Sequence, residues 1–277
     1  MSEKMKIAVL QTAVHAEKMK NMEQLANILD GPALEGVDLV TLPEMFNCPY
    51  DTKMFPEYAE EEGDTCWKIC SELARKHHVY LAAGSMPEKD KEGKIYNTSY
   101  VFDRSGSQIA KYRKMHLFDI AVEGGQHFKE SDTLTAGDAI GIFDTEFGKI
   151  GLAICYDIRF PELFRILADR GAGIVLVPAS FNMTTGPAHW ELLFRQRAVD
   201  NQIFMIGTSA ARDVNSGYVS WGHSIVTDPW GTVQMQMEDK ENVYIGELEM
   251  ESIERIREQL PLLAHRRQDI YQIRCTD

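Results

Sequence analysis

The chain has 277 residues, 44% hydrophobic and 26% charged, a composition typical of a globular protein that buries its own core. Its 42 acidic and 29 basic side chains give a net charge of −13, which argues against nucleic acid or an anionic membrane surface as partner. No apolar run approaches the roughly 18 residues of a membrane span. The first residues lack a secretory pattern and the five scattered cysteines are odd in number, so we expect a cytoplasmic protein.

Short runs rich in Val and Ile alternate with amphipathic stretches in the first half of the chain. Their periodicity predicts, in order, a strand at 6–10, a helix at 17–29, a strand at 37–42, a helix at 61–77 and a strand at 79–85. Such alternation is typical of βαβ units, so it predicts an α/β fold.

The second half repeats this order. Its segments at 149–155, 172–181, 203–209 and 223–234 are similar, in turn, to those at 6–11, 36–46, 79–85 and 98–109. This similarity indicates an internal two-fold, with two similar sheets that each carry their own helices, although α/β strands often look alike. Because no Pro-, Gly- or Ser-rich linker divides the halves, we expect one domain over 1–277, a sandwich of two sheets between helical layers.

Cys155 ends the apolar run KIGLAIC and precedes YDIRFPE. Reactive groups gather beyond the C-terminal ends of parallel strands, where nearby backbone N–H groups can hold an oxyanion. The alternative is a buried core cysteine, the commonest fate of a free thiol. Cys66 and Cys70, four apart on a predicted helix, and Cys275 near the C-terminus fit that alternative better, whereas Cys48 follows Glu44 in a loop.

Glu44 and Lys114 also follow predicted strands, in LVTLPEMF and QIAKYRK. Alone, each reads as a solvated loop acid or a surface lysine. Together with Cys155 they supply a base, an oxyanion donor and a nucleophile for acyl transfer. A free Glu (pKa about 4.3) is a poor base for a free Cys (about 8.5). We therefore expect a desolvated pocket that raises the pKa of Glu44, and an ammonium that lowers the pKa of Cys155.

Other chemistries lack sequence support. The chain has no CxxC, HExxH or clustered His set for zinc, no P-loop or early GxGxxG for nucleotides, and no GxSxG serine motif. His189, before Trp190 at a predicted helix start, reads as a structural histidine in preference to a pocket residue.

The blocks LPEMF, YRKMHLFD and ICYDIRFPE, in this order and spacing, resemble the three signature blocks of the nitrilase superfamily of carbon–nitrogen hydrolases. The resemblance spans about residues 5 to 271. It implies an αββα sandwich with Cys155 as nucleophile, Glu44 as general base and Lys114 as the oxyanion cation. It also implies the backbone N–H of Tyr156 in the oxyanion hole and Glu130, in HFKES, as a second site glutamate. It implies no metal or organic cofactor, and a homodimer or higher homo-oligomer.

The stretches SFNMTTGPAHWELLFRQRAVDNQ (180–202) and GYVSWGH (217–223) resemble the omega-amidase branch, which hydrolyses the terminal amide of dicarboxylic monoamides such as 2-oxoglutaramate. Its substrate's distal carboxylate needs a cation, and Arg159, about one helical turn after Cys155, can bind it bidentately. Phe181 and Thr185 would complete the pocket. Arg159 could equally form an ion pair with Asp157 or Glu162.

Several alternatives remain open on the sequence alone. Related branches that act on deaminated glutathione, N-carbamoyl amines, aliphatic amides or simple nitriles share the three blocks. A catalytically silent scaffold of the same fold is a further alternative, although a scaffold has no need of Glu44, Lys114 and Cys155 together.

Overall fold

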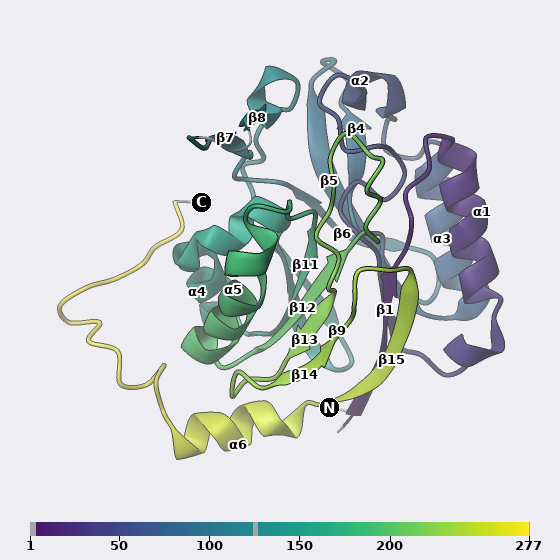
Figure 1. Cartoon of the computed structure of the whole chain (residues 1–277). Helices are drawn as coiled ribbons and strands as arrows, with labels where there is room; N and C mark the ends of the chain where they lie inside the picture. The colour runs from purple at the N-terminus through teal and green to yellow at the C-terminus, as the bar shows by residue number, and fades with distance from the viewer. Residues whose placement is uncertain (1–3, 124–126, 277) are drawn as a thin grey trace.

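The computed structural model describes residues 4–123 and 127–276. Two sheets pack face to face at its centre (Figure 1). The outer face of one carries α1 (Lys18–Leu29) and α3 (Thr65–His77), and the outer face of the other carries α4 (Pro161–Asp169) and α5 (Gly186–Asn201). The four-layer αββα sandwich expected from the sequence is therefore confirmed.

The first sheet has seven strands around a parallel centre. Its order is β15 (Asn242–Glu249), β1 (Lys4–Gln11), β2 (Leu39–Thr41), β3 (Tyr80–Ala82), β5 (Ile95–Phe102) and β4 (Met86–Lys89), with β6 (Gln108–Arg113) also paired to β5. Strands β1, β2 and β3 are parallel, whereas β15 and β5 pair antiparallel on either side of them.

The second sheet repeats this plan with six strands. Its order is β14 (Val233–Gln236), β13 (Ile225–Thr227), β12 (Phe204–Ser209), β11 (Ala172–Ala179), β10 (Gly148–Leu152) and β9 (Gly141–Thr145). Strands β10, β11 and β12 are parallel, and β9 and β13 flank them antiparallel. The parallel triplets lie in the segments whose sequences resemble one another, so the internal two-fold is visible in the topology.

Strand β1 shows why the layers form. Met5, Ile7 and Val9 pack into the core between the sheets, whereas Ala8 and Leu10, on the alternate face, pack into the core under α1 and α3. A strand buried on both faces needs the nearly continuous apolar run that the sequence has here. The hydroxyls of Thr41 and Thr208 meet at 2.8 Å across the two sheets.

The remaining elements lie at the edges of the sandwich. They are α2 (Phe55–Tyr58), a small hairpin of β7 (Asp119–Ala121) and β8 (His127–Lys129), and α6 (Glu251–Gln259), which leads into an extended C-terminal segment. None of the helices in the described ranges has the length and apolar character needed to cross a lipid bilayer.

The predicted elements differ from the observed ones mainly at their ends. The helix expected at 61–77 begins only at Thr65, because Asp64 turns back to accept the backbone N–H of Glu61 at 3.1 Å and Gly63 takes a φ of +91°. Strands β2 and β3 are three residues each, and the chain after β2 turns away into the loop that carries Glu44.

Candidate active site

Four side chains expected in the site follow strands, three of them in the two large sheets and one in the β7–β8 hairpin. Glu44 follows β2, Lys114 follows β6 and Cys155 follows β10, where it starts a 3₁₀ turn, Cys155–Arg159. Glu130 starts a second 3₁₀ turn after β8. All four are buried and interact with one another, so the structure brings together in one interior site groups that the sequence spreads over more than a hundred positions.

Lys114 lies between the two glutamates. Its Nζ is 3.0 Å from Glu44 Oε1 and 2.9 Å from Glu130 Oε1, and all three side chains are inaccessible to solvent. Glu130 Oε2 accepts the backbone N–H of Phe118 at 2.7 Å. The two carboxylates compensate the charge of the buried ammonium, which would be costly to bury without a partner.

The two oxygens of Glu44 have different surroundings. Oε1 accepts the amide of Asn97 at 2.9 Å as well as Lys114, and the hydroxyl of Tyr50 lies 3.4 Å away. Oε2 is buried and accepts no hydrogen bond from the described groups. The Cys155 thiol is near enough to act on the Glu44 carboxyl, although the pair lacks ordinary hydrogen-bond geometry. The oxygen without a partner is thus available for a proton.

Burial shifts the protonation equilibria of this cluster. It raises the pKa of Glu44 above the ordinary value of 4.5, and Lys114 only partly opposes the shift. Burial would lower the pKa of Lys114, but Glu130 and Glu44 together outweigh burial and raise it. Lys114 is therefore a permanent cation, and Glu44 is a stronger base than a solvated glutamate.

Cys155 lies on a strained turn. Its φ of +47° is in the left-handed region that a residue with a Cβ rarely adopts, and such strain is typical of functional sites. Burial raises the pKa of its thiol well above 9.0, and Glu44 raises it further, while Lys114 and the Ser180 backbone lower it. Lys114 lowers the pKa of Cys155 as expected, but burial and the adjacent Glu44 carboxylate outweigh it, so the net shift is upward.

The residues expected around the substrate lie beside the 3₁₀ turn. Tyr156 is its second residue, with its ring edge-on to Phe118 at 5.1 Å. The Arg159 guanidinium lies over the Phe181 ring, 5.0 Å from its centroid. Its Nη1 is 3.2 Å from His189 Nδ1, so His189 is a neighbour of this group.

Arg159 makes no ion pair with Asp157 or Glu162 in the described structure. Asp157 instead bonds to Tyr112 and His116, and Glu162 is exposed. Thr185 is half-buried before α5, and its hydroxyl donates to Asn182 Oδ1 at 3.0 Å. Among the described residues, the guanidinium contacts aromatic and imidazole groups and forms no ion pair with a carboxylate.

Sequence reasoning did not select Tyr50 or Asn97. The Tyr50 hydroxyl donates to Glu130 Oε1 at 2.6 Å, and Asn97 both donates to Glu44 and accepts the backbone N–H of Lys114 at 2.8 Å. Tyr50 lies six residues after Glu44 in the same loop, which was an available signal. Asn97 sits inside β5, where nothing in the sequence distinguishes it from an ordinary strand residue.

A cavity of about 200 Å³ reaches this cluster at Glu44. Glu44, Tyr50, Ser180 and Tyr218 line it together with Cys48. Cys48 is buried there, and burial raises its pKa strongly, as it does for Cys70. Cys66 and Cys70 are buried in α3, as expected of core cysteines, and none of these three thiols has the strained turn of Cys155.

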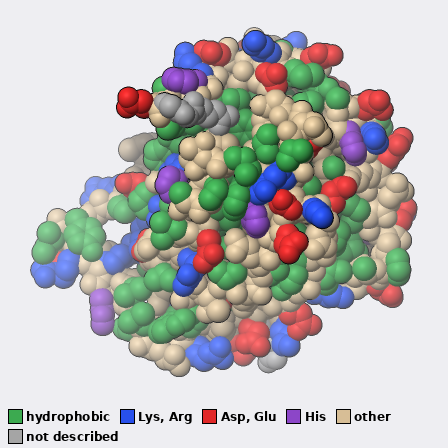
Figure 2. All heavy atoms as spheres, in the orientation of Figure 1, with side chains coloured by type: hydrophobic (Ala, Val, Ile, Leu, Met, Phe, Trp, Pro, Cys, Tyr) green, Lys and Arg blue, Asp and Glu red, His purple; other side chains and the backbone are tan. Residues whose placement is uncertain are grey.

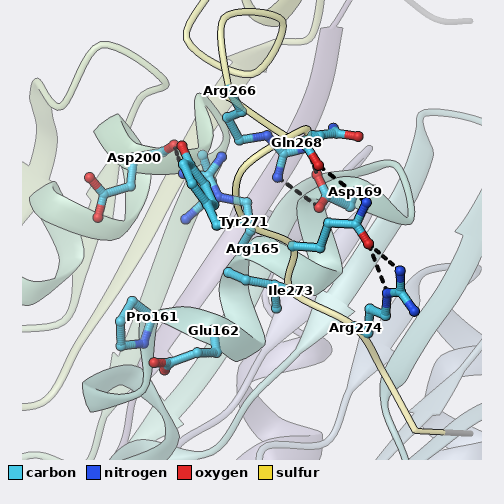
Figure 3. Close-up of a pocket in the computed structure, with 12 residues that line it drawn as sticks. Pro161, Glu162, Arg165, Asp169, Asp200, Arg266, Gln268, Tyr271, Ile273 and Arg274 are labelled. Atoms are coloured by element: carbon cyan, nitrogen blue, oxygen red, sulfur yellow. Dashed lines mark hydrogen bonds and ion pairs between the residues drawn. The ribbon is translucent and has the colours of Figure 1, made fainter.

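A second cavity, of about 630 Å³, lies between α4, the end of α5 and the C-terminal segment (Figure 3). Arg266 bonds there to both oxygens of Asp169, at 2.7 and 2.8 Å, and Arg274 bonds to Gln272. Its lining mixes paired cations and carboxylates and has no thiol among the described residues, so it offers no comparable chemistry.

Comparisons with known proteins agree with this site. The sequence model of the carbon–nitrogen hydrolase family matches residues 6–258. The omega-amidases NIT2 of Bos taurus and Homo sapiens are each 45% identical over 269 residues, which cover 97% of this chain and of each relative.

Solved structures give the same answer. The crystal structure of Saccharomyces cerevisiae Nit3, a member of branch 10 of the nitrilase superfamily, is 40% identical, with a TM-score of 0.89 over 96% of this chain and 98% of that one. A carbon–nitrogen hydrolase from Helicobacter pylori is 30% identical, with a TM-score of 0.86 over 97% of each chain. The chain therefore belongs to the carbon–nitrogen hydrolase family and is an amidase of the nitrilase superfamily.

Proposed function

We propose that this amidase hydrolyses the terminal amide of short dicarboxylic monoamides, of which 2-oxoglutaramate is the example, and releases ammonia through a thioester on Cys155. The observation that carries the proposal is the buried cluster of Glu44, Lys114 and Glu130 beside the strained turn of Cys155. The identity to omega-amidases supports the choice of substrate.

In the first half-reaction the Cys155 sulfur attacks the amide carbon while its proton passes to Glu44 Oε2. The raised pKa of Glu44 favours this transfer from a thiol. The carbonyl oxygen becomes an oxyanion, which Lys114 Nζ and the Tyr156 N–H stabilise. The C–N bond then breaks, and the leaving nitrogen takes the proton from Glu44 and departs as ammonia, leaving a thioester.

In the second half-reaction water replaces the amine. Glu44, again ionised, takes a proton from a water molecule that attacks the thioester carbon, and the same donors hold the second oxyanion. The C–S bond breaks, the thiolate recovers the proton from Glu44, and the carboxylic acid leaves. Glu130 keeps Lys114 charged and in place, since its carboxylate lies 2.9 Å from Nζ.

Arg159 is proposed to bind the distal carboxylate of the substrate. Among the described residues its guanidinium has aromatic and imidazole neighbours but no carboxylate, which supports a role in binding an anion. Phe181, buried under that guanidinium, would contact the acyl chain, and Thr185 would complete the pocket. A charge-assisted hydrogen bond is worth roughly 1.5–3 kcal/mol.

The test compares 2-oxoglutaramate with an uncharged amide of the same length. Arg159→Gln should lower kcat/KM for 2-oxoglutaramate by about 10- to 150-fold and barely affect the uncharged amide. Arg195→Gln, which removes an exposed arginine of α5, is the matched control and should change neither. If wild type handles both amides equally, the omega-amidase assignment falls in favour of an aliphatic amidase or carbamoyl hydrolase.

The nucleophile is tested separately. Cys155→Ala should abolish ammonia release while the circular dichroism spectrum stays that of wild type. Cys48→Ala, which removes the buried thiol that lines the cavity at Glu44, is the control and should remain active. A folded Cys155→Ala variant that still releases ammonia would overturn the thioester mechanism. A wild-type protein inactive on a panel of omega-amides, carbamoyl amines and nitriles would favour a silent scaffold.

We also propose a homodimer in the cytoplasm. Leu192 and Val199, two helical turns apart on α5, are 60% and 36% exposed, and Ile270 and Tyr271 of the C-terminal segment are 67% and 56% exposed. Figure 2 shows hydrophobic side chains beside Lys and Arg on that segment, at the left edge of the molecule. Light scattering should give twice the chain mass, and Leu192→Glu with Val199→Glu should give the monomer. A wild-type monomer at all concentrations would refute the dimer.

A further inference from the structure

One buried carboxylate joins the two loops that carry Cys155 and Lys114. Asp157 Oδ2 accepts the backbone N–H of Ile154 and the hydroxyl of Tyr112, each at 2.8 Å. Its Oδ1 accepts the backbone N–H of His116 at 3.0 Å and lies 2.7 Å from the ring Nδ1 of the same residue. Asp157 is completely buried, so these contacts hold it without solvent.

The positions of these partners in the chain matter. Ile154 and Asp157 bracket Cys155, whereas Tyr112 and His116 bracket Lys114. The first pair follows β10 of one sheet, whereas Tyr112 lies in β6 of the other and His116 follows it, so the Asp157 carboxylate connects loops from opposite sheets. Hydrogen bonds to an ionised acceptor are about twice as strong as neutral ones. A carboxylate is therefore well suited to connect the Cys155 loop with the Lys114 loop.

The link also bears on the strain at Cys155. A non-glycine residue keeps a φ of +47° only where contacts with the surrounding structure hold its backbone in that conformation. The bond from the Ile154 N–H to Asp157 closes the turn on both sides of Cys155. Asp157 is fully buried and its carboxylate oxygens contact protein groups of the two loops, so its effect on the reaction is exerted through those loops.

We infer that Asp157 is a positioning residue for the reaction, which keeps the Cys155 sulfur in register with Lys114 Nζ by holding both loops. This inference rests on the proposed role of Cys155 as nucleophile. It differs from a merely structural role, because loss of the link should slow the chemical step in protein that remains folded.

The variant Asp157→Asn keeps the size of the side chain but replaces one acceptor oxygen with a donor. With 2-oxoglutaramate, kcat should fall by about 10- to 100-fold, the range expected from a misplacement near 1 Å, while KM changes by less than about twofold. The rate at which iodoacetamide alkylates Cys155, measured by mass spectrometry of the peptide that contains Cys155, should fall together with kcat.

The matched control is Glu88→Gln. Glu88 is a second buried carboxylate, which accepts Thr98 at 2.6 Å and two bonds from Arg113 outside the site. Its loss should lower the unfolding midpoint but leave kcat and alkylation within about twofold of wild type. If both variants lose activity only in proportion to stability, Asp157 is structural and the inference fails.

If Asp157→Asn does not fold, His116→Ala tests the same link through a partly exposed ring. It should lower kcat by at least about threefold without raising KM, and an unchanged kcat would overturn the inference. Failure of the proposed function looks different. In that case Cys155→Ala stays active or iodoacetamide does not label Cys155 in wild type, whatever Asp157→Asn does.

Discussion

Replacing Lys114 by methionine tests the buried charge cluster most directly. The change keeps the length of the side chain and removes the ammonium of Lys114, whose Nζ lies 3.0 Å from Glu44 and 2.9 Å from Glu130. At an effective dielectric constant of about 20, each contact is worth roughly 5–6 kcal/mol before desolvation. Desolvation offsets much of this gain, and breaking a buried pair costs about 3–5 kcal/mol in practice.

The loss of stability should depend on pH. Lys114 lowers the pKa of Glu44 in the folded protein, so its removal raises a pKa that burial has already raised above 4.5. A carboxyl with a raised folded pKa contributes stability that is fully present below its unfolded pKa. That contribution is lost as pH rises through the folded value, by about 1.4 kcal/mol per pH unit. The variant should therefore lie closer to wild type at pH 5 than at pH 8.

Urea unfolding at both pH values measures this difference, and ammonia release measures the chemistry. The variant should lose on the order of 10²–10³ in kcat, the usual cost of one oxyanion donor. Lys111→Met is the matched control. Lys111 is partly exposed, and its buried partner Glu88 retains its ion pair with Arg113 when Lys111 is replaced. A Lys114→Met protein as stable as Lys111→Met at pH 8, or one changed only in KM, would refute the reasoning.

Three further predictions concern the same cluster. In wild type kcat/KM should fall as pH drops through the Glu44 pKa, with the acid limb above 4.5 because the base must be ionised, and a limb below 4.5 would contradict burial of the base. Asn97→Ala removes a 2.9 Å hydrogen bond to Glu44 and should lower kcat by about 10-fold or more at saturating substrate. A change in KM alone would argue against a role for Asn97 in positioning Glu44. Glu130→Gln should keep the fold and lower kcat, with iodoacetamide still labelling Cys155, whereas unchanged steady-state rates would remove Glu130 from the reaction.

The sandwich was predictable because its signals are local and repeated. Val- and Ile-rich runs buried on both faces, such as β1, appear in the sequence as continuous apolar segments, and their second copies mark the second sheet. The order of strands within each sheet was not predictable from periodicity alone, since it depends on which apolar faces meet. The assignment of 1–277 to one domain stays a prediction.

The site was only partly predictable, for a different reason. Glu44, Lys114 and Cys155 each follow a strand, so their placement could be inferred from the chain itself. Asn97 and Asp157 act through contacts 53 and 41 residues away along the chain, with Glu44 and His116, and no local pattern encodes these. The lowering effect of Lys114 on the pKa of Cys155 was expected, but the net upward shift was not, because it depends on burial and on the distance to Glu44, which are properties of the fold.

The internal repeat explains why this site needs the whole sandwich. The first half of the chain supplies the base and the cation, Glu44 and Lys114, and the second half supplies the nucleophile, Cys155. Thr12, directly after β1, has a backbone carbonyl that accepts the N–H of Ala211, after β12, at 2.9 Å, so this bond joins the two sheets. Because the reacting groups come from opposite sheets, their alignment depends on the packed core between them. Loosening that core should therefore separate the nucleophile from its base before either sheet unfolds.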